Sequence, residues 1–143
     1  MRNVTLYLLV LLVVEAILII LPHSTHTTTL MVKHQVLLYS IMIGGIGGIL
    51  HCLRSIYLHA CVEKNWDNEW LPWYFIRPIA SLISGGIAYL FIKAGLIVLE
   101  ADQSTEPTNF AIYALSFVAG YNVDRFLAKI DEISEAVFGI KRK

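Results

Sequence analysis

Four stretches of this chain carry almost no charged side chains, and they restrict its fold more than any other feature. They are residues 4–21, 36–53, 78–99 and 110–123. A helix rises about 1.5 Å per residue, so the first three stretches are each long enough to cross a hydrocarbon layer about 30 Å thick. The fourth becomes long enough with its flanking residues. The pattern predicts an all-α integral membrane protein built as a four-helix bundle.

Composition agrees with a membrane setting. The chain has 143 residues, of which 57% are hydrophobic, more apolar surface than a soluble domain of this size can hide. We expect spans over about 4–21, 36–58, 74–99 and 109–124, followed by a cytoplasmic extension of the last helix over 125–143. What remains is too little for another domain, so 1–143 is a single transmembrane domain. Formal charge is zero, which argues against nucleic acid as a direct partner.

Basic residues predict the orientation. Lys and Arg concentrate between the second and third spans and in the tail, so both termini should be cytoplasmic. The first span is unlike a signal peptide, because it is long and contains Glu15. At the inner surface, arginines and tryptophans should anchor the protein to lipid headgroups, since guanidinium groups bind phosphate and indole rings prefer the boundary. These anchors are Arg54, Arg77, Trp70 and Trp73.

Small residues interrupt the second and third spans. Glycines inside a helix are costly unless another backbone approaches closely. The sequence therefore predicts that these two spans pack together through flat faces, with helix–helix contacts at Gly44, Gly45, Gly47 and Gly48 in one span and Ser81, Ser84, Gly85 and Gly86 in the other.

Glu15 is the sharpest single clue to function. A carboxylate inside a span costs several kcal/mol unless it faces a cavity, a partner or copies of itself. In an oligomer, copies of Glu15 can form a ring that draws cations into a pore. Alternatively, Glu15 is protonated, or it reaches toward Lys93 in the same half of the membrane. Both interpretations stay open.

The tail carries apolar residues at alternating spacings of three and four, which is typical of a heptad seam. After Val123 the seam continues through Phe126, Ile130, Ile133, Val137 and Ile140. Its carboxylates would be repelled by an anionic leaflet, which favours a protein over lipid as the seam's partner. That protein is a second copy in a homo-oligomer or a soluble cytoplasmic effector, and packing beneath the chain's own bundle is the third option.

The sequence lacks the common catalytic motifs, including HExxH, GxSxG and a Walker loop, and its spans hold few polar groups. We therefore expect no enzymatic activity and no cofactor. His51, Cys52, His59 and Cys61 do not share one helix face, so we expect no metal site.

Two motifs suggest a relationship. Residues 73–78 read W-Y-F-I-R-P, and residues 120–126 read G-Y-N-V-D-R-F before the amphipathic tail. In these features the chain resembles a loose group of small bacterial four-helix membrane proteins, some of which are similar to membrane components of antiviral defence systems. The resemblance implies a multi-pass protein of the bacterial inner membrane. Glu15, the glycine faces and the heptad tail all favour self-association. Within that setting we therefore expect a homo-oligomeric, pore-forming or membrane-perturbing component of antiphage defence. One alternative is a non-conducting anchor or sensor for a soluble effector, and another is a phage holin.

Overall fold

The computed structural model describes residues 2–20, 29–95 and 109–139, and most of these residues lie in helices. The long helices are α1 (Arg2–Ile20), α2 (Thr29–Tyr57) and α3 (Leu71–Lys93), followed by the shorter α4 (Asn109–Tyr121) and α5 (Val123–Phe138). A π-helical turn, η2 (Leu58–Val62), and a 3-10 turn, η3 (Asn68–Trp70), connect α2 to α3. The described part of the chain is thus all-α, as predicted.

Three helical segments are long and apolar enough to cross a membrane: α1, the segment His34–Val62 and α3. They indicate a multi-pass membrane protein. The fourth expected span contains α4, which has 13 residues and is short for a crossing by itself. Residue 21 and residues 96–99, where two spans were expected to end, lie outside the described residues.

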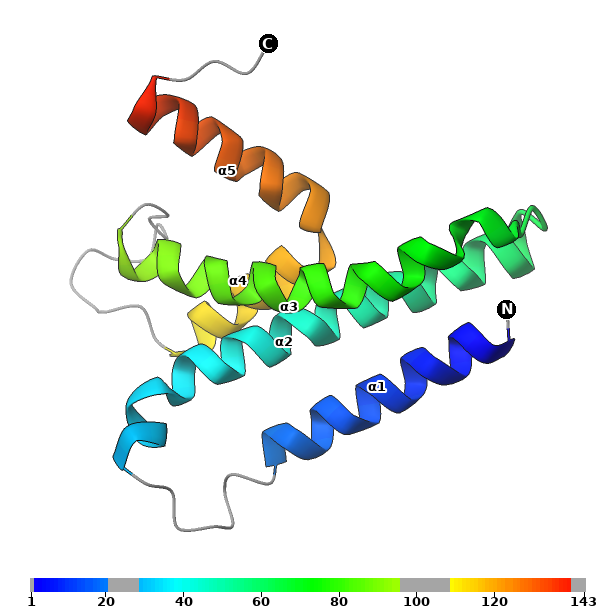
Figure 1. Cartoon of the computed structure of the whole chain (residues 1–143), viewed down its shortest axis with the longest axis horizontal. Coiled ribbons are helices and arrows are strands. Elements are labelled where there is room, and N and C mark those ends of the chain that lie inside the picture. The colour runs from blue at the N-terminus through cyan, green and yellow to red at the C-terminus, as the bar shows by residue number, and fades with distance from the viewer. Residues whose placement is uncertain (1, 21–28, 96–108, 140–143) are drawn as a thin grey trace.

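The helix α2 lies at the centre and contacts α1, α3 and α4, while α3 also contacts α4. In Figure 1, α1, α2 and α3 run along the long axis, and α4 crosses α2 and α3. The apolar core joins α1 to the end of α2 and the start of α3, through Val4 and Leu8 against Ile49, Cys52 and Tyr74. One stripe of α1 therefore packs against α2 and α3, and most of its other side chains are exposed.

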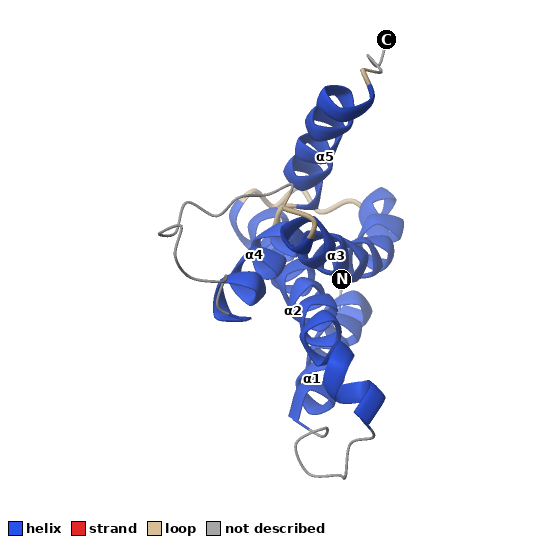
Figure 2. Cartoon of the chain, turned by 90° about the vertical axis from the view of Figure 1, so that its left-hand side faces the viewer, coloured by secondary structure: helices blue, strands red, loops and turns tan. Residues whose placement is uncertain are grey.

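The last helix does not continue into the tail, which corrects the prediction of one unbroken helix. α4 ends at Tyr121, and Asn122 leaves the helical region with φ −116° and ψ 51°. α5 then points away from the other helices, as Figures 1 and 2 show. In an unbroken helix the carbonyl of Tyr121 would accept a bond from the backbone four residues on. Here it accepts one from Arg77 of α3.

Candidate functional site

Glycines let three helices meet at one point. A Cβ atom built on Gly44 of α2 would stand 2.6 Å from the Cα of Gly85 on α3. One built on Gly120 of α4 would overlap the carbonyl of Gly44, and one built on Gly47 would stand 2.5 Å from the carbonyl oxygen of Phe117. Only residues without side chains allow these backbones to approach so closely. We call Gly44, Gly85 and Gly120 the glycine crossing.

Serine hydroxyls stabilise the crossing. Oγ of Ser81 lies 2.9 Å from two carbonyl oxygens, those of Arg77 on its own helix and Gly120 on α4. Ser81 also lies directly over Gly48 of α2. Ser84 donates to the carbonyl of Ala80 within α3. Ser81 is thus a polar link between α3 and α4 inside an apolar bundle, where a hydrogen bond contributes about 1 kcal/mol.

Gly45 and Gly86 have different neighbours. A Cβ at Gly45 would meet the carboxyl of Glu15 and the side chain of Leu82, whereas one at Gly86 would stand 2.9 Å from Cγ1 of Ile41. Gly45 therefore faces α1, and Gly86 lies under a side chain of α2.

Arg77 joins α3 to the end of α4 and to the start of α5. Its side chain is 2% exposed. Nη1 donates to Oδ2 of Asp124 over 2.8 Å, Nη2 donates to the carbonyl of Tyr121 over 3.4 Å, and Cζ lies 4.9 Å from the centre of the Trp73 ring. From the sequence we expect Arg77 at the lipid headgroups, whereas the structure places it inside the protein. The reason is Asp124, a counter-ion 47 residues away in the chain that no local motif connects to Arg77.

The other expected headgroup residues are exposed. Arg54 lies on the exposed surface of α2. Trp70 is about half exposed and stacks on His59 of η2, with ring centres 5.8 Å apart. Trp73 is also exposed, and its ring faces Arg77. Lipid contact stays a prediction for these three residues.

His59 belongs to a small polar network. Its Nδ1 lies 3.0 Å from Oε2 of Glu63 and 3.0 Å from Oδ1 of Asn65. Among the residues that the structure describes, no three or more His, Cys, Asp or Glu side chains are grouped so that they could hold a metal ion.

Glu15 lies inside the bundle of its own chain. It is 4% exposed, and its carboxyl stands over Gly45 of α2 beside Leu82 of α3. Neither carboxyl oxygen has a hydrogen-bond partner within the described residues. Lys93 is exposed at the far end of α3, and no ion pair joins it to Glu15. The two charges that the sequence places in the same half of the membrane are therefore not brought together.

The seam of α5 is only partly covered. Val123 is buried at the start of the helix, and Phe126, Ile130 and Ile133 are half-buried. Val137 is 58% exposed, and Leu127, which follows Phe126 in the chain, is exposed as well. Ile140, the last seam residue, lies outside the described residues. Among the described residues, then, the apolar face of α5 is only partly covered by its own chain.

No protein-family model, curated protein or solved structure matches this chain. The resemblance to small bacterial membrane proteins therefore stays a prediction.

Proposed function

We propose that this chain is the subunit of a homo-oligomeric protein of the bacterial inner membrane that makes the membrane permeable to cations. One observation carries the proposal: Glu15 is buried among candidate membrane-spanning helices without a hydrogen-bond partner in the described residues. Burying an unpartnered carboxyl costs free energy, and ionisable groups inside membranes commonly serve ion or proton pathways.

The position of Glu15 restricts how such a pathway opens. Its carboxyl faces Gly45 and Leu82 of the same chain, so it does not line a central axis between subunits in this conformation. A carboxylate ring requires α1 to turn or to move away from α2 and α3. The helix α1 suits such a movement, because Val4, Leu8 and Glu15 are its buried contacts among the described residues.

Assembly is supported by α5. Its apolar face is half open in the single chain, and Leu127 and Val137 are exposed. Heptad spacing favours association with the same helix of another copy. The resemblance to membrane components of antiviral defence systems suggests the setting, in which membrane permeabilisation would be part of an antiphage response.

The test is ion flux through liposomes that contain the purified full-length chain. We expect cation flux in the wild type and a loss of about tenfold in Glu15→Gln, because the amide cannot carry the charge that attracts cations. Lys93→Gln is the matched control, since it removes an exposed charge from α3, and we expect its flux to equal that of the wild type. A strictly monomeric protein that passes no ions would contradict the proposal.

A second candidate is a non-conducting anchor or sensor that recruits a soluble effector through α5. The observation that favours it is the direction of α5, which points away from the bundle with its apolar face half open. An amphipathic helix of this kind can lie in the groove of another protein. Under this alternative Glu15 has only a structural role, and Glu15→Gln leaves the recruitment of the effector unchanged.

A further inference from the structure

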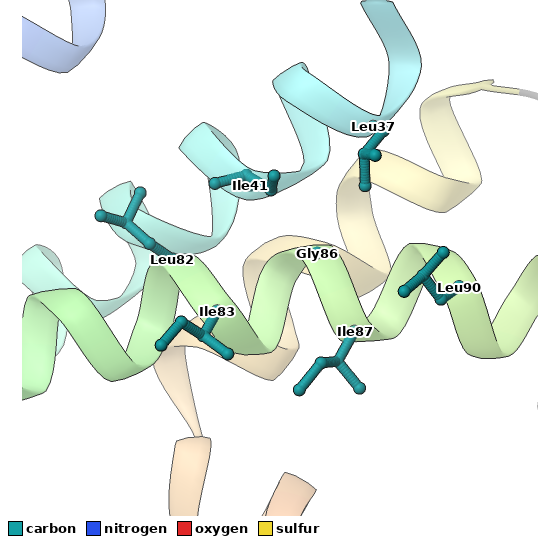
Figure 3. Close-up of a pocket in the computed structure, with 7 residues that line it drawn as sticks. All are labelled: Leu37, Ile41, Leu82, Ile83, Gly86, Ile87 and Leu90. Carbon is teal, nitrogen blue, oxygen red and sulfur yellow. The ribbon is translucent and has the colours of Figure 1, made fainter. Parts of the chain in front are cut away.

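An apolar groove runs between α2 and α3, with a volume of about 350 Å³. Figure 3 shows its lining, to which α2 contributes Leu37 and Ile41 and α3 contributes the other residues. The residues that line it are Leu37, Ile41, Leu82, Ile83, Gly86, Ile87 and Leu90. Gly86 is buried, and because it has no side chain, Ile41 of α2 packs over its backbone. The volume lies at the lower end of the range for small-molecule sites, about 300–1,000 Å³.

One end of this groove adjoins Glu15. A Cβ atom built on Gly45 would stand 2.5 Å from Oε1 of Glu15 and 2.6 Å from Cδ2 of Leu82. The carboxyl and the Leu82 methyl group are therefore neighbours. Leu82 also forms a wall of the groove, so this one side chain borders both the groove and the carboxyl of Glu15.

The carboxyl of Glu15 lacks a hydrogen-bond donor, and a molecule bound in the groove can provide one. Glu15 is 4% exposed, and both of its oxygens are without a hydrogen-bond partner in the described residues. Leaving a buried polar group unsatisfied is unfavourable. A molecule that lies in the groove and donates a hydrogen bond to Glu15 removes that penalty while its apolar part contacts the walls.

We propose that the groove and Glu15 together bind a single-chain lipid whose head donates a hydrogen bond, such as a long-chain alcohol. The hydrocarbon chain lies along Gly86 between the side chains of α2 and α3. The hydroxyl group reaches past Leu82 and donates to the carboxyl of Glu15. This binding does not depend on whether the assembled protein conducts ions, so the two proposals stand or fall separately.

The test uses dicyclohexylcarbodiimide, a reagent that partitions into membranes and reacts with protonated carboxylic acids. The carboxyl O–H adds across one C=N bond and no group leaves, so the labelled peptide gains the mass of one reagent molecule. The full-length protein is labelled in phosphatidylcholine nanodiscs, and the Glu15 peptide is measured by mass spectrometry. We expect labelling of the wild type and none at this position in Glu15→Gln.

Competition then tests the ligand. Dodecanol at about ten times its Kd should slow the labelling of Glu15 about tenfold, whereas dodecane at the same mole fraction should not slow it. The difference isolates the hydroxyl group, because both molecules have the same hydrocarbon chain.

Groove variants test the location. Gly86→Leu adds a side chain where Ile41 already packs and so forces side chains into the groove. Ile83→Trp narrows the outer edge at an exposed position, so this second variant serves if the first does not fold. In either folded variant, dodecanol should no longer protect Glu15. Ala114→Leu, a matched enlargement at an exposed position on α4, should keep the protection. The proposal is overturned if wild-type Glu15 is not labelled, if dodecane and dodecanol act alike, or if the groove variants behave as the wild type does.

Discussion

Arg77 of α3 donates a hydrogen bond to Asp124 of α5, with Nη1 and Oδ2 2.8 Å apart. The two side chains differ sharply in their surroundings, because Arg77 is 2% exposed and Asp124 is 68% exposed. Asp124 also lies in the first turn of its helix, where a negative charge is favourable. This pair, together with the bond from Arg77 to the carbonyl of Tyr121, fixes the bend between α4 and α5.

Removing the charge of Asp124 should destabilise the protein. In Asp124→Asn the guanidinium of Arg77 stays buried without its counter-ion, which is unfavourable. We expect a loss of about 1–2 kcal/mol in the free energy of unfolding, less than the loss for a fully buried pair because the carboxylate is largely exposed. Thermal unfolding in detergent measures the change.

A second ion pair in α5 provides the control for this prediction. Nζ of Lys129 and Oε2 of Glu132 lie 2.6 Å apart, and both side chains are about two-thirds exposed. Glu132→Gln should therefore change the stability by less than about 0.5 kcal/mol. If Asp124→Asn is no more destabilising than Glu132→Gln, Arg77 does not depend on Asp124.

The candidate membrane spans in α2 and α3 could be predicted from the sequence, because contact with lipid requires apolar side chains along the whole length of a helix. Side chains that face hydrocarbon must be apolar, so the near absence of charge in residues 36–53 and 78–99, in which Lys93 is the one charged residue, is visible without any knowledge of packing. Residues 36–53 lie within α2, and residues 78–93 lie within α3. The concentration of glycine and serine in the same two helices also marks where backbones meet.

The bend at Asn122 and the burial of Arg77 could not be predicted in this way. Seam spacing is the same whether the helix is straight or broken at one residue, so Val123 and Phe126 carry no sign of the break. The weak local signal is Gly120 with Asn122, two poor helix formers. Arg77 and Asp124 are 47 positions apart, and no periodicity relates residues on separate helices. The inward direction of Glu15 also depends on tertiary packing.

The glycine crossing should be intolerant of even a methyl group. Gly120→Ala places a Cβ on the carbonyl of Gly44, so α4 must move away from α2. Overpacking of this kind costs about 1–3 kcal/mol, and the midpoint of thermal unfolding should fall. Gly86→Ala is the control, because its Cβ would meet only the side chain of Ile41 and not the backbone of another helix, and it should therefore be less destabilising. Equal destabilisation by the two variants would show that the crossing has no special role.

Variants in α5 should distinguish the two candidate functions. In Ile130→Ser with Ile133→Ser, two half-buried residues of the seam lose their apolar surface. If α5 joins copies of this chain, the particle mass in nanodiscs should fall to that of the monomer, because seam contacts hold the copies together. Lys129→Ser with Glu132→Ser changes the exposed polar pair and should leave the mass unchanged. An oligomer that survives the Ile substitutions contradicts assembly through α5.

The arrangement across the membrane is the central claim, and cysteine accessibility tests it most directly. Cys61 is exposed in η2, whereas Cys52 is buried, so Cys52→Ala leaves one native reporter. Separate proteins that lack both native cysteines carry Lys93→Cys or Lys129→Cys, each at an exposed position. With a membrane-impermeant maleimide, Cys61 and Lys129→Cys should react from the cytoplasmic face and Lys93→Cys from the opposite face. Reaction of Cys61 and Lys93→Cys from the same face would contradict a membrane-spanning α3 and, with it, the account of this protein.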